Sequence, residues 1–223
     1  MTQHLGFALF WLPWLLLSCS SDLMGQRTAH DPNAFGCSSS HYMLDDFQNQ
    51  PTALSPDNAK AVQLTKKCGF RVISGKRVIS DFNLPDMSAN VEVGWSPDSS
   101  QFFISYSDGG AVGGYHVYLY SLVGGTIRPS DIPRKVAQRF RVQHWCQSRG
   151  NNLFFLGWTA DSKLAFLVGE VYPTSDCGKE LGQYRGYEVR VSDGKILHVF
   201  DEKETDSIEK NCRDSGRLAL PSY

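Results

Sequence analysis

Three short segments of the chain are nearly identical, and an apolar run follows each of them. The segments read ALSPD at 53–57, GWSPD at 94–98 and GWTAD at 157–161. The runs that follow occupy 60–64, 101–106 and 164–168, and a second match comes later in each copy, at 70–79, 117–127 and 188–197. A repeat constrains the architecture before any single residue is interpreted, because every copy must build the same supersecondary unit.

The spacing of the copies predicts one sheet for each of them. Ser55 and Ser96 are 41 positions apart, within the roughly 40–45 residues of a four-stranded propeller blade. Ser96 and Thr159 are 63 positions apart, so the second copy must carry an insertion. We place it at 128–150, where the chain is basic and has no counterpart in the other copies, and we expect it to be irregular or to form a short helix.

Strand and turn chemistry recur inside each copy. Ser-Pro-Asp indicates a β-turn, because Pro presets φ and Asp bonds back to nearby amides. Residues 116–120 and 187–191 alternate between apolar and polar as strands with one buried face do. Gly75 and Gly194 are expected in tight hairpins that need a positive φ. A large apolar residue precedes each turn and is expected to pack one sheet on the next. These residues are Leu54, Trp95 and Trp158.

These motifs resemble the β-propeller repeats of the TolB-like and WD40-like class, whose blades carry a W-S-P-D-G unit before an apolar strand. Residues 95–98 match that unit well, 54–57 lack the aromatic residue, and 158–161 keep the Trp and the Asp. The resemblance covers about 53–200 and implies an all-β, propeller-like array of three to four antiparallel four-stranded blades. A closed propeller usually has at least four blades, and the chain shows three copies. Either residues 36–46 join the C-terminal segment in a fourth, degenerate blade, or the sheets form an open array.

The N-terminus predicts export. Residues 5–17 are apolar, broken by Pro13 and too short to span a bilayer, as in the core of a secretory signal. The sequence Leu16-Leu17-Ser18-Cys19 resembles the lipobox of bacterial lipoproteins, which implies that Cys19 is lipidated. Release after ordinary cleavage and an uncleaved anchor remain alternatives. We therefore expect a signal peptide at 1–18, a polar tether at 19–40, one domain at 41–212 and a tail at 213–223. The repeats within that domain are about 53–93, 94–156 and 157–200.

Six cysteines occur in the chain. In an exported protein, the five besides Cys19 are candidates for disulfides. We prefer Cys146 with Cys177 and Cys37 with Cys68, which leaves Cys212 over, although other pairings are possible. No metal site is expected, because the spacings of metal-binding motifs are missing.

Charge and motifs exclude several classes of function. The formal net charge of −1 argues against a nucleic-acid partner. The chain contains no G-x-S-x-G, H-E-x-x-H, phosphate-binding or calcium-loop motif, so neither a catalytic residue nor a cofactor is predicted. Glu170 and the acidic run 201–206 are expected to be solvated.

Two loops have the composition of a contact surface. Tyr, Trp and Arg dominate the energetics of interfaces, and they gather in the insertion and in the loop 170–187. The candidate contact residues are Arg139, Arg141, His144, Trp145, Tyr172, Tyr184 and Arg185.

The sequence favours a non-catalytic, lipid-anchored protein of the bacterial cell envelope that binds a protein or glycan partner. The alternatives are an envelope hydrolase or lyase with a site between blades, and a periplasmic inhibitor or immunity-type protein.

Overall fold

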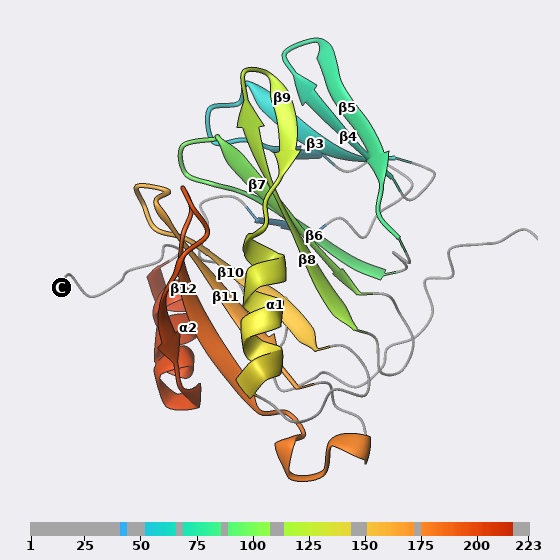
Figure 1. Cartoon of the computed structure of the whole chain (residues 1–223). Coiled ribbons are helices and arrows are strands. Elements are labelled where there is room, and N and C mark those ends of the chain that lie inside the picture. The colour runs from blue at the N-terminus through green and yellow to red at the C-terminus, as the bar shows by residue number, and fades with distance from the viewer. Residues whose placement is uncertain are drawn as a thin grey trace, which may run out of the picture.

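A computed structural model describes residues 41–43, 52–65, 69–85, 89–107, 114–143, 151–171 and 175–215. It is mostly β, with three antiparallel sheets in succession along the chain (Figure 1). The first sheet contains β2 (Thr52–Leu54), β3 (Lys60–Thr65), β4 (Gly69–Ser74) and β5 (Arg77–Asn83). The second contains β1 (His41–Met43), β6 (Ala89–Trp95), β7 (Gln101–Ser107), β8 (Tyr115–Val123) and β9 (Thr126–Pro129). The third contains β10 (Asn152–Trp158), β11 (Leu164–Glu170), β12 (Tyr184–Arg190) and β13 (Ile196–Phe200). Each copy of the repeat therefore builds one four-stranded antiparallel unit, as the sequence predicted.

The repeated turn has the same hydrogen bonds in all three sheets. In the second, the Ser96 hydroxyl donates to Asp98 Oδ1 at 2.6 Å and accepts from the Gln101 amide at 2.9 Å. Ser55 and Thr159 make the equivalent pairs in the first and third sheets. The carboxylates of Asp57, Asp98 and Asp161 also accept a backbone amide two residues on. The Asp-to-amide bonding predicted from the sequence is confirmed.

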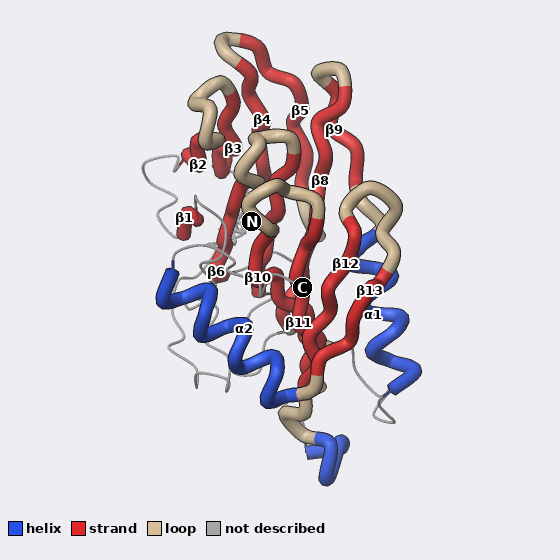
Figure 2. The backbone as a smooth tube through the Cα atoms, turned by 90° about the vertical axis from the view of Figure 1, so that its left-hand side faces the viewer, coloured by secondary structure: helices blue, strands red, loops and turns tan. Residues whose placement is uncertain are grey.

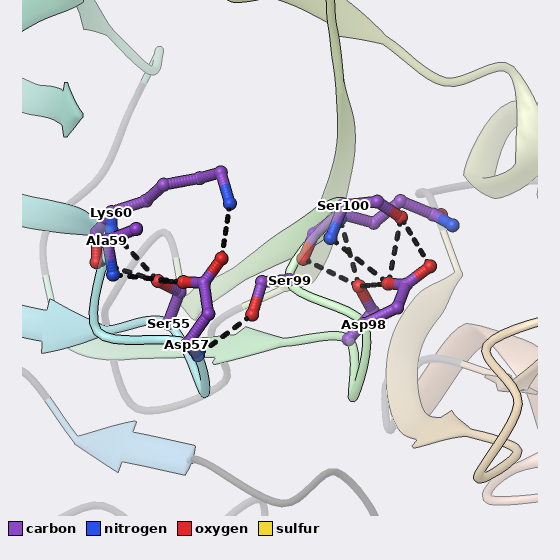
Figure 3. Close-up of polar contacts among 9 residues, drawn as sticks. Ser55, Asp57, Ala59, Lys60, Asp98, Ser99 and Ser100 are labelled. Carbon is purple, nitrogen blue, oxygen red and sulfur yellow. Dashed lines mark hydrogen bonds and ion pairs between the residues drawn. The ribbon is translucent and has the colours of Figure 1, made fainter.

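Neighbouring turns are also bonded to each other. Asn58, Ser99 and Ser162 hold the left-handed position of their turns, with φ near 55–60°. The Asp57 amide donates to Ser99 Oγ at 3.1 Å, and the Asp98 amide donates to Ser162 Oγ at 3.2 Å. Figure 3 shows the first of these bonds between the turns of the first two sheets. The motif therefore shapes each turn and ties it to the next.

The two tryptophans occupy the seams between sheets, as predicted. Trp95 is fully buried, and its Nε1 donates to the Ala53 carbonyl of the first sheet at 3.0 Å. Trp158 lies 5.8 Å from Phe103 of the second sheet, measured between ring centroids. The prediction for Leu54 was wrong, because its side chain is 43% exposed and the buried residue of β2 is Ala53. No described sheet precedes the first one, so Leu54 has no seam to fill.

Glycines allow the tight hairpins. Gly75 has φ 57° between β4 and β5, and Gly194 has φ 66° between β12 and β13. Strand β8 carries the alternating burial expected of 116–120 except at Leu119 and Tyr120, which are both buried. The alternation expected of 187–191 was wrong, because residues 186–189 of β12 are all buried.

The predicted insertion contains α1 (Ile132–Gln143), which contacts β8, β11 and β12. A second helix, α2 (Glu202–Ser215), contacts β12 and β13. The two lie on opposite faces of the third sheet (Figure 2), since α1 belongs to the core with Phe155 and Leu167, whereas α2 joins the core with Phe154 and Phe166. A 3₁₀ helix, η2 (Ser175–Glu180), precedes β12.

The expectation for the termini needs two corrections. The acidic run 201–206 is not merely solvated surface, because it begins α2, where Thr205 is buried. Residues 41–43 pair with β6 of the second sheet, and residues 202–215 are helical, so the described residues contain no fourth blade built from both termini. What they show is a blade-like array without a closed ring.

No helix within the described residues is long and apolar enough to cross a membrane.

Candidate binding surface

Helix α1 is held on the third sheet by one apolar stripe. Ile132, Val136 and Phe140 recur every four residues and are all buried, as expected for the inward face of a helix. The Phe140 ring lies against the backbone of Gly169 in β11, where a Cβ atom would come within 2.8 Å of Phe140 Cγ. It also packs edge-on against Tyr187 of β12. The helix is therefore fixed in position.

The outward side of α1 carries two cations that have no ion-pair partner among the described residues. The helix contains four basic residues and no acidic ones. Arg134 pairs with Asp131 at 3.0 Å, and Lys135 donates to the Asp193 carbonyl at 2.8 Å. Arg139 and Arg141 are exposed and form no ion pair with any described residue. About 100° of helix turn separates successive residues, so these two arginines flank the side of α1 opposite Phe140.

Val142 lies between the two arginines on that outward side and is 81% exposed. Arginine is one of the residue types enriched in interface hot spots, and the two guanidinium groups lie on either side of an exposed apolar residue. Residues 144–150 follow directly, and His144 and Trp145, both predicted as contact residues, lie outside the described residues.

Strand β12 adds a third arginine beside the end of α1. Arg185 lies opposite Gly169 in the β11–β12 register, so its side chain begins on the face that α1 covers. Its Nη1 is 3.5 Å from Glu202 Oε1 and donates to the Tyr184 carbonyl at 2.9 Å. The Tyr187 hydroxyl donates to Gln143 Oε1 at 2.7 Å and ties β12 to the last residue of α1.

Arg139 and Arg185 both act on the Tyr187 hydroxyl. Burial, the largest effect, raises the pKa of Tyr187, and the positive charges of the two arginines lower it. Both guanidinium groups are thus near one phenol, which remains protonated at neutral pH. From the predicted set, the structure places Arg139 and Arg141 on α1 and Arg185 on β12. We name the group Arg139, Arg141, Val142, Gln143 and Arg185 the α1 surface.

Tyr184 does not join this surface. Its hydroxyl donates to Asp206 of α2, on the opposite face of the sheet. Burial, the largest effect, raises the pKa of Tyr184, and the carboxylate of Asp206 raises it further. Tyr172 lies outside the described residues, so its role remains a prediction.

Cys177 is half-buried against the core beneath α1 and is disulfide-bonded. Its expected partner Cys146 lies outside the described residues, as do Cys19, Cys37 and Cys68, so the pairings remain predictions.

Two other polar pairs bear on catalysis. His198 Nε2 lies 3.4 Å from Glu188 Oε2, and the Glu188 side chain is only 4% exposed. Burial raises the pKa of Glu188, while His198 lowers it. Glu170 is 2% exposed and accepts from Asn152 Nδ2 at 2.9 Å, so the expectation of a solvated carboxylate was wrong. No group of three potential metal ligands occurs within the described ranges.

Sequence reasoning missed Val142 and Gln143, and it placed Tyr187 in a contact loop rather than in the packing of β12 against α1. The signal was available in the spacing of Ile132, Val136 and Phe140, because a helix that buries this stripe must expose Val142. No protein-family model matches the chain, and no curated protein matches it.

Proposed function

We propose that this protein is exported, anchored to a bacterial envelope membrane through a lipid on Cys19, and acts without catalysis by binding an envelope protein or glycan at the α1 surface. One observation carries the proposal: Arg139 and Arg141 are exposed without ion-pair partners among the described residues, on a helix fixed by a buried stripe.

Rigidity is what makes this arrangement suited to recognition. A fixed helix presents its side chains at little conformational cost on binding. Arginine donates paired hydrogen bonds to carboxylate or phosphate groups, so the surface favours an anionic partner. An inhibitor or immunity-type protein would use the same contacts against an acidic enzyme.

The binding proposal is tested by charge reversal. We expect Arg139→Glu with Arg141→Glu to abolish cross-linking and co-purification of envelope partners. The matched control is Arg128→Glu with Lys210→Glu, which changes the net charge equally at exposed positions outside the α1 surface. Equal recovery of partners by both double variants would contradict the proposal.

The anchoring proposal has a separate test. Wild-type protein is expected in the membrane fraction and Cys19→Ser in the soluble fraction, because multiple acyl chains hold a protein stably on a bilayer. A Cys19→Ser protein that stays in the membrane fraction would rule out lipid anchoring.

A hydrolase or lyase activity is the second candidate, favoured by the buried Glu188 beside His198. His198 is half-exposed and lies on β13 at the outer edge of the third sheet. If the pair is catalytic, His198→Asn abolishes turnover of envelope glycans while circular dichroism remains unchanged.

A further inference from the structure

The outer face of the first sheet carries an apolar row that crosses all four strands. Leu54 lies opposite Ala61, Ala61 opposite Ile73, and Ile73 opposite Val78. Leu54 is 43% exposed and Val78 is 46% exposed, whereas Ala61 is buried and Ile73 is half-buried. The core of the first two sheets lies on the other face, where Val62, Leu64 and Val72 are buried.

The same row forms the seam in the other two sheets. In the second sheet the register joins Trp95, Phe102, Tyr120 and Pro129. The first three of these pack in the core shared with the first sheet. In the third sheet it joins Trp158, Ala165, Val189 and Ile196, all packed in the core shared with the second sheet and α1. The row of Leu54 and Val78 is thus a seam row, built by the repeat, with no described sheet preceding it. We name it the open seam.

A polar row beside the open seam is complementary to itself. Gln63 lies opposite Arg71, and Arg71 opposite Asp81. Arg71 Nε is 2.8 Å from Asp81 Oδ1, and both side chains are about half exposed. A twofold axis through this face would bring Arg71 of one copy toward Asp81 of the other. Such isologous contacts need opposite charges within a single patch.

The opposite end of the array is covered by α2. Thr205 packs against Gly186 of β12, and Ile208 packs on the core that contains Phe154 and Phe166. Terminal units of stacked repeats need such a cap. Within the part of the chain that the structure describes, one end of the array is therefore open, and pairing of open ends stops at two copies.

We propose that two copies of this chain associate through the open seam, with their first sheets packed face to face. This inference does not depend on the α1 surface or on the lipid, and it concerns a different face of the molecule. Aligned packing of two sheets buries the interior rows of both against each other. Leu54 and Val78 of each copy then lose their exposure to water.

The test is the mass of the purified Cys19→Ser protein in light scattering after gel filtration, since this variant has no acyl chain to drive association. We expect a dimer for this protein and monomers for Val78→Lys and Leu54→Lys. The dissociation constant of the dimer should rise roughly 100-fold, because each dimer of a lysine variant would bury two unpaired ammonium groups. Val123→Lys is the matched control, since Val123 is 50% exposed at the β8–β9 hairpin, outside this face, and it should leave the dimer intact.

Three results would overturn the proposal: a monomeric Cys19→Ser protein at micromolar concentration, dimers that persist in both seam variants, or equal loss of dimer in Val123→Lys. Circular dichroism checks the folding of each variant. If Val78→Lys does not fold, Val78→Thr replaces it, because strands tolerate threonine, and its dimer should dissociate more readily than that of Cys19→Ser.

Discussion

At the scale of single residues, the repeat is preserved through the hydroxyl that begins each turn. Ser96 Oγ donates to Asp98 and accepts from the Gln101 amide, and both Ser96 and Gln101 are buried. Thr159 makes the same bonds but is only half-buried. One motif therefore has different energetic weight in different sheets, because an unmade hydrogen bond costs more where water cannot replace it.

We expect Ser96→Ala to lower the free energy of unfolding by about 1–3 kcal/mol, because the Gln101 amide then loses its buried acceptor. Thr159→Ala should lower the free energy of unfolding by less than Ser96→Ala does, since water reaches the turn at Thr159. Denaturant unfolding of both variants measures the difference, and equal costs would show that burial of the turn is unimportant.

The turn carboxylates predict how stability depends on pH. The pKa of Asp161 falls to about 2, chiefly because Thr159 donates to it, and the pKa of Asp57 is lowered chiefly by Lys60. A carboxyl whose folded pKa is depressed stabilises the fold above its unfolded pKa of about 4, and this contribution is lost as the pH falls toward the folded value.

The double variant Asp57→Asn with Asp161→Asn should therefore lose less stability than wild type between about pH 4 and pH 2. Circular dichroism during acid titration measures this. Parallel curves for the two proteins would show that these carboxyls do not contribute.

At the scale of elements, both helices rest on glycines of the third sheet. Phe140 of α1 lies on Gly169, and Thr205 of α2 lies on Gly186, on adjacent strands. Sequence alone located α1 through its insertion but missed α2, although Asp201 and Glu204 are spaced as a capping box. They form one, with both amide-to-carboxylate distances 2.9 Å. The run resembled solvated charge because its apolar content is low, and only contact with the third sheet shows why it is helical.

Gly169→Ala is expected to destabilise the protein by about 1–3 kcal/mol, because the new methyl group displaces Phe140. In the background of Phe140→Ala, Gly169→Ala should lower the free energy of unfolding only slightly, because the ring that it would displace is no longer there. The two substitutions form a double-mutant cycle. Chemical denaturation of the four proteins measures the coupling. Additive costs would mean that α1 is not seated on Gly169.

At the scale of the whole molecule, the chain is a row of sheets with unlike ends. The sequence predicted three to four sheets from three copies of one motif, and the described residues form three. It could not predict which end is covered, because the cover is a helix outside the repeat. Only the arginines of the α1 surface were predicted from the sequence, because they stood out by composition. The contact between Tyr187 and Gln143 could not be predicted, because it arises only when β12 packs against α1.

Ending the chain after Asp201 removes the cap and uncovers the core of Phe154, Leu156, Phe166 and Val168. We expect the truncated protein to bind a hydrophobic dye and to aggregate, because exposed apolar faces associate. Light scattering and dye fluorescence measure this, with Lys210→Glu as a full-length control. A truncated protein that stays monomeric without binding dye would show that α2 is dispensable as a cover.

The place of α2 after the third sheet in the sequence has a consequence for biogenesis. Domains fold from the N-terminus as the polypeptide is made, and the residues that seal the third sheet are synthesised after all four of its strands. Until they emerge, the nascent chain displays a ready-made hydrophobic patch to any chaperone nearby. Release from that chaperone is then coupled to the synthesis of α2.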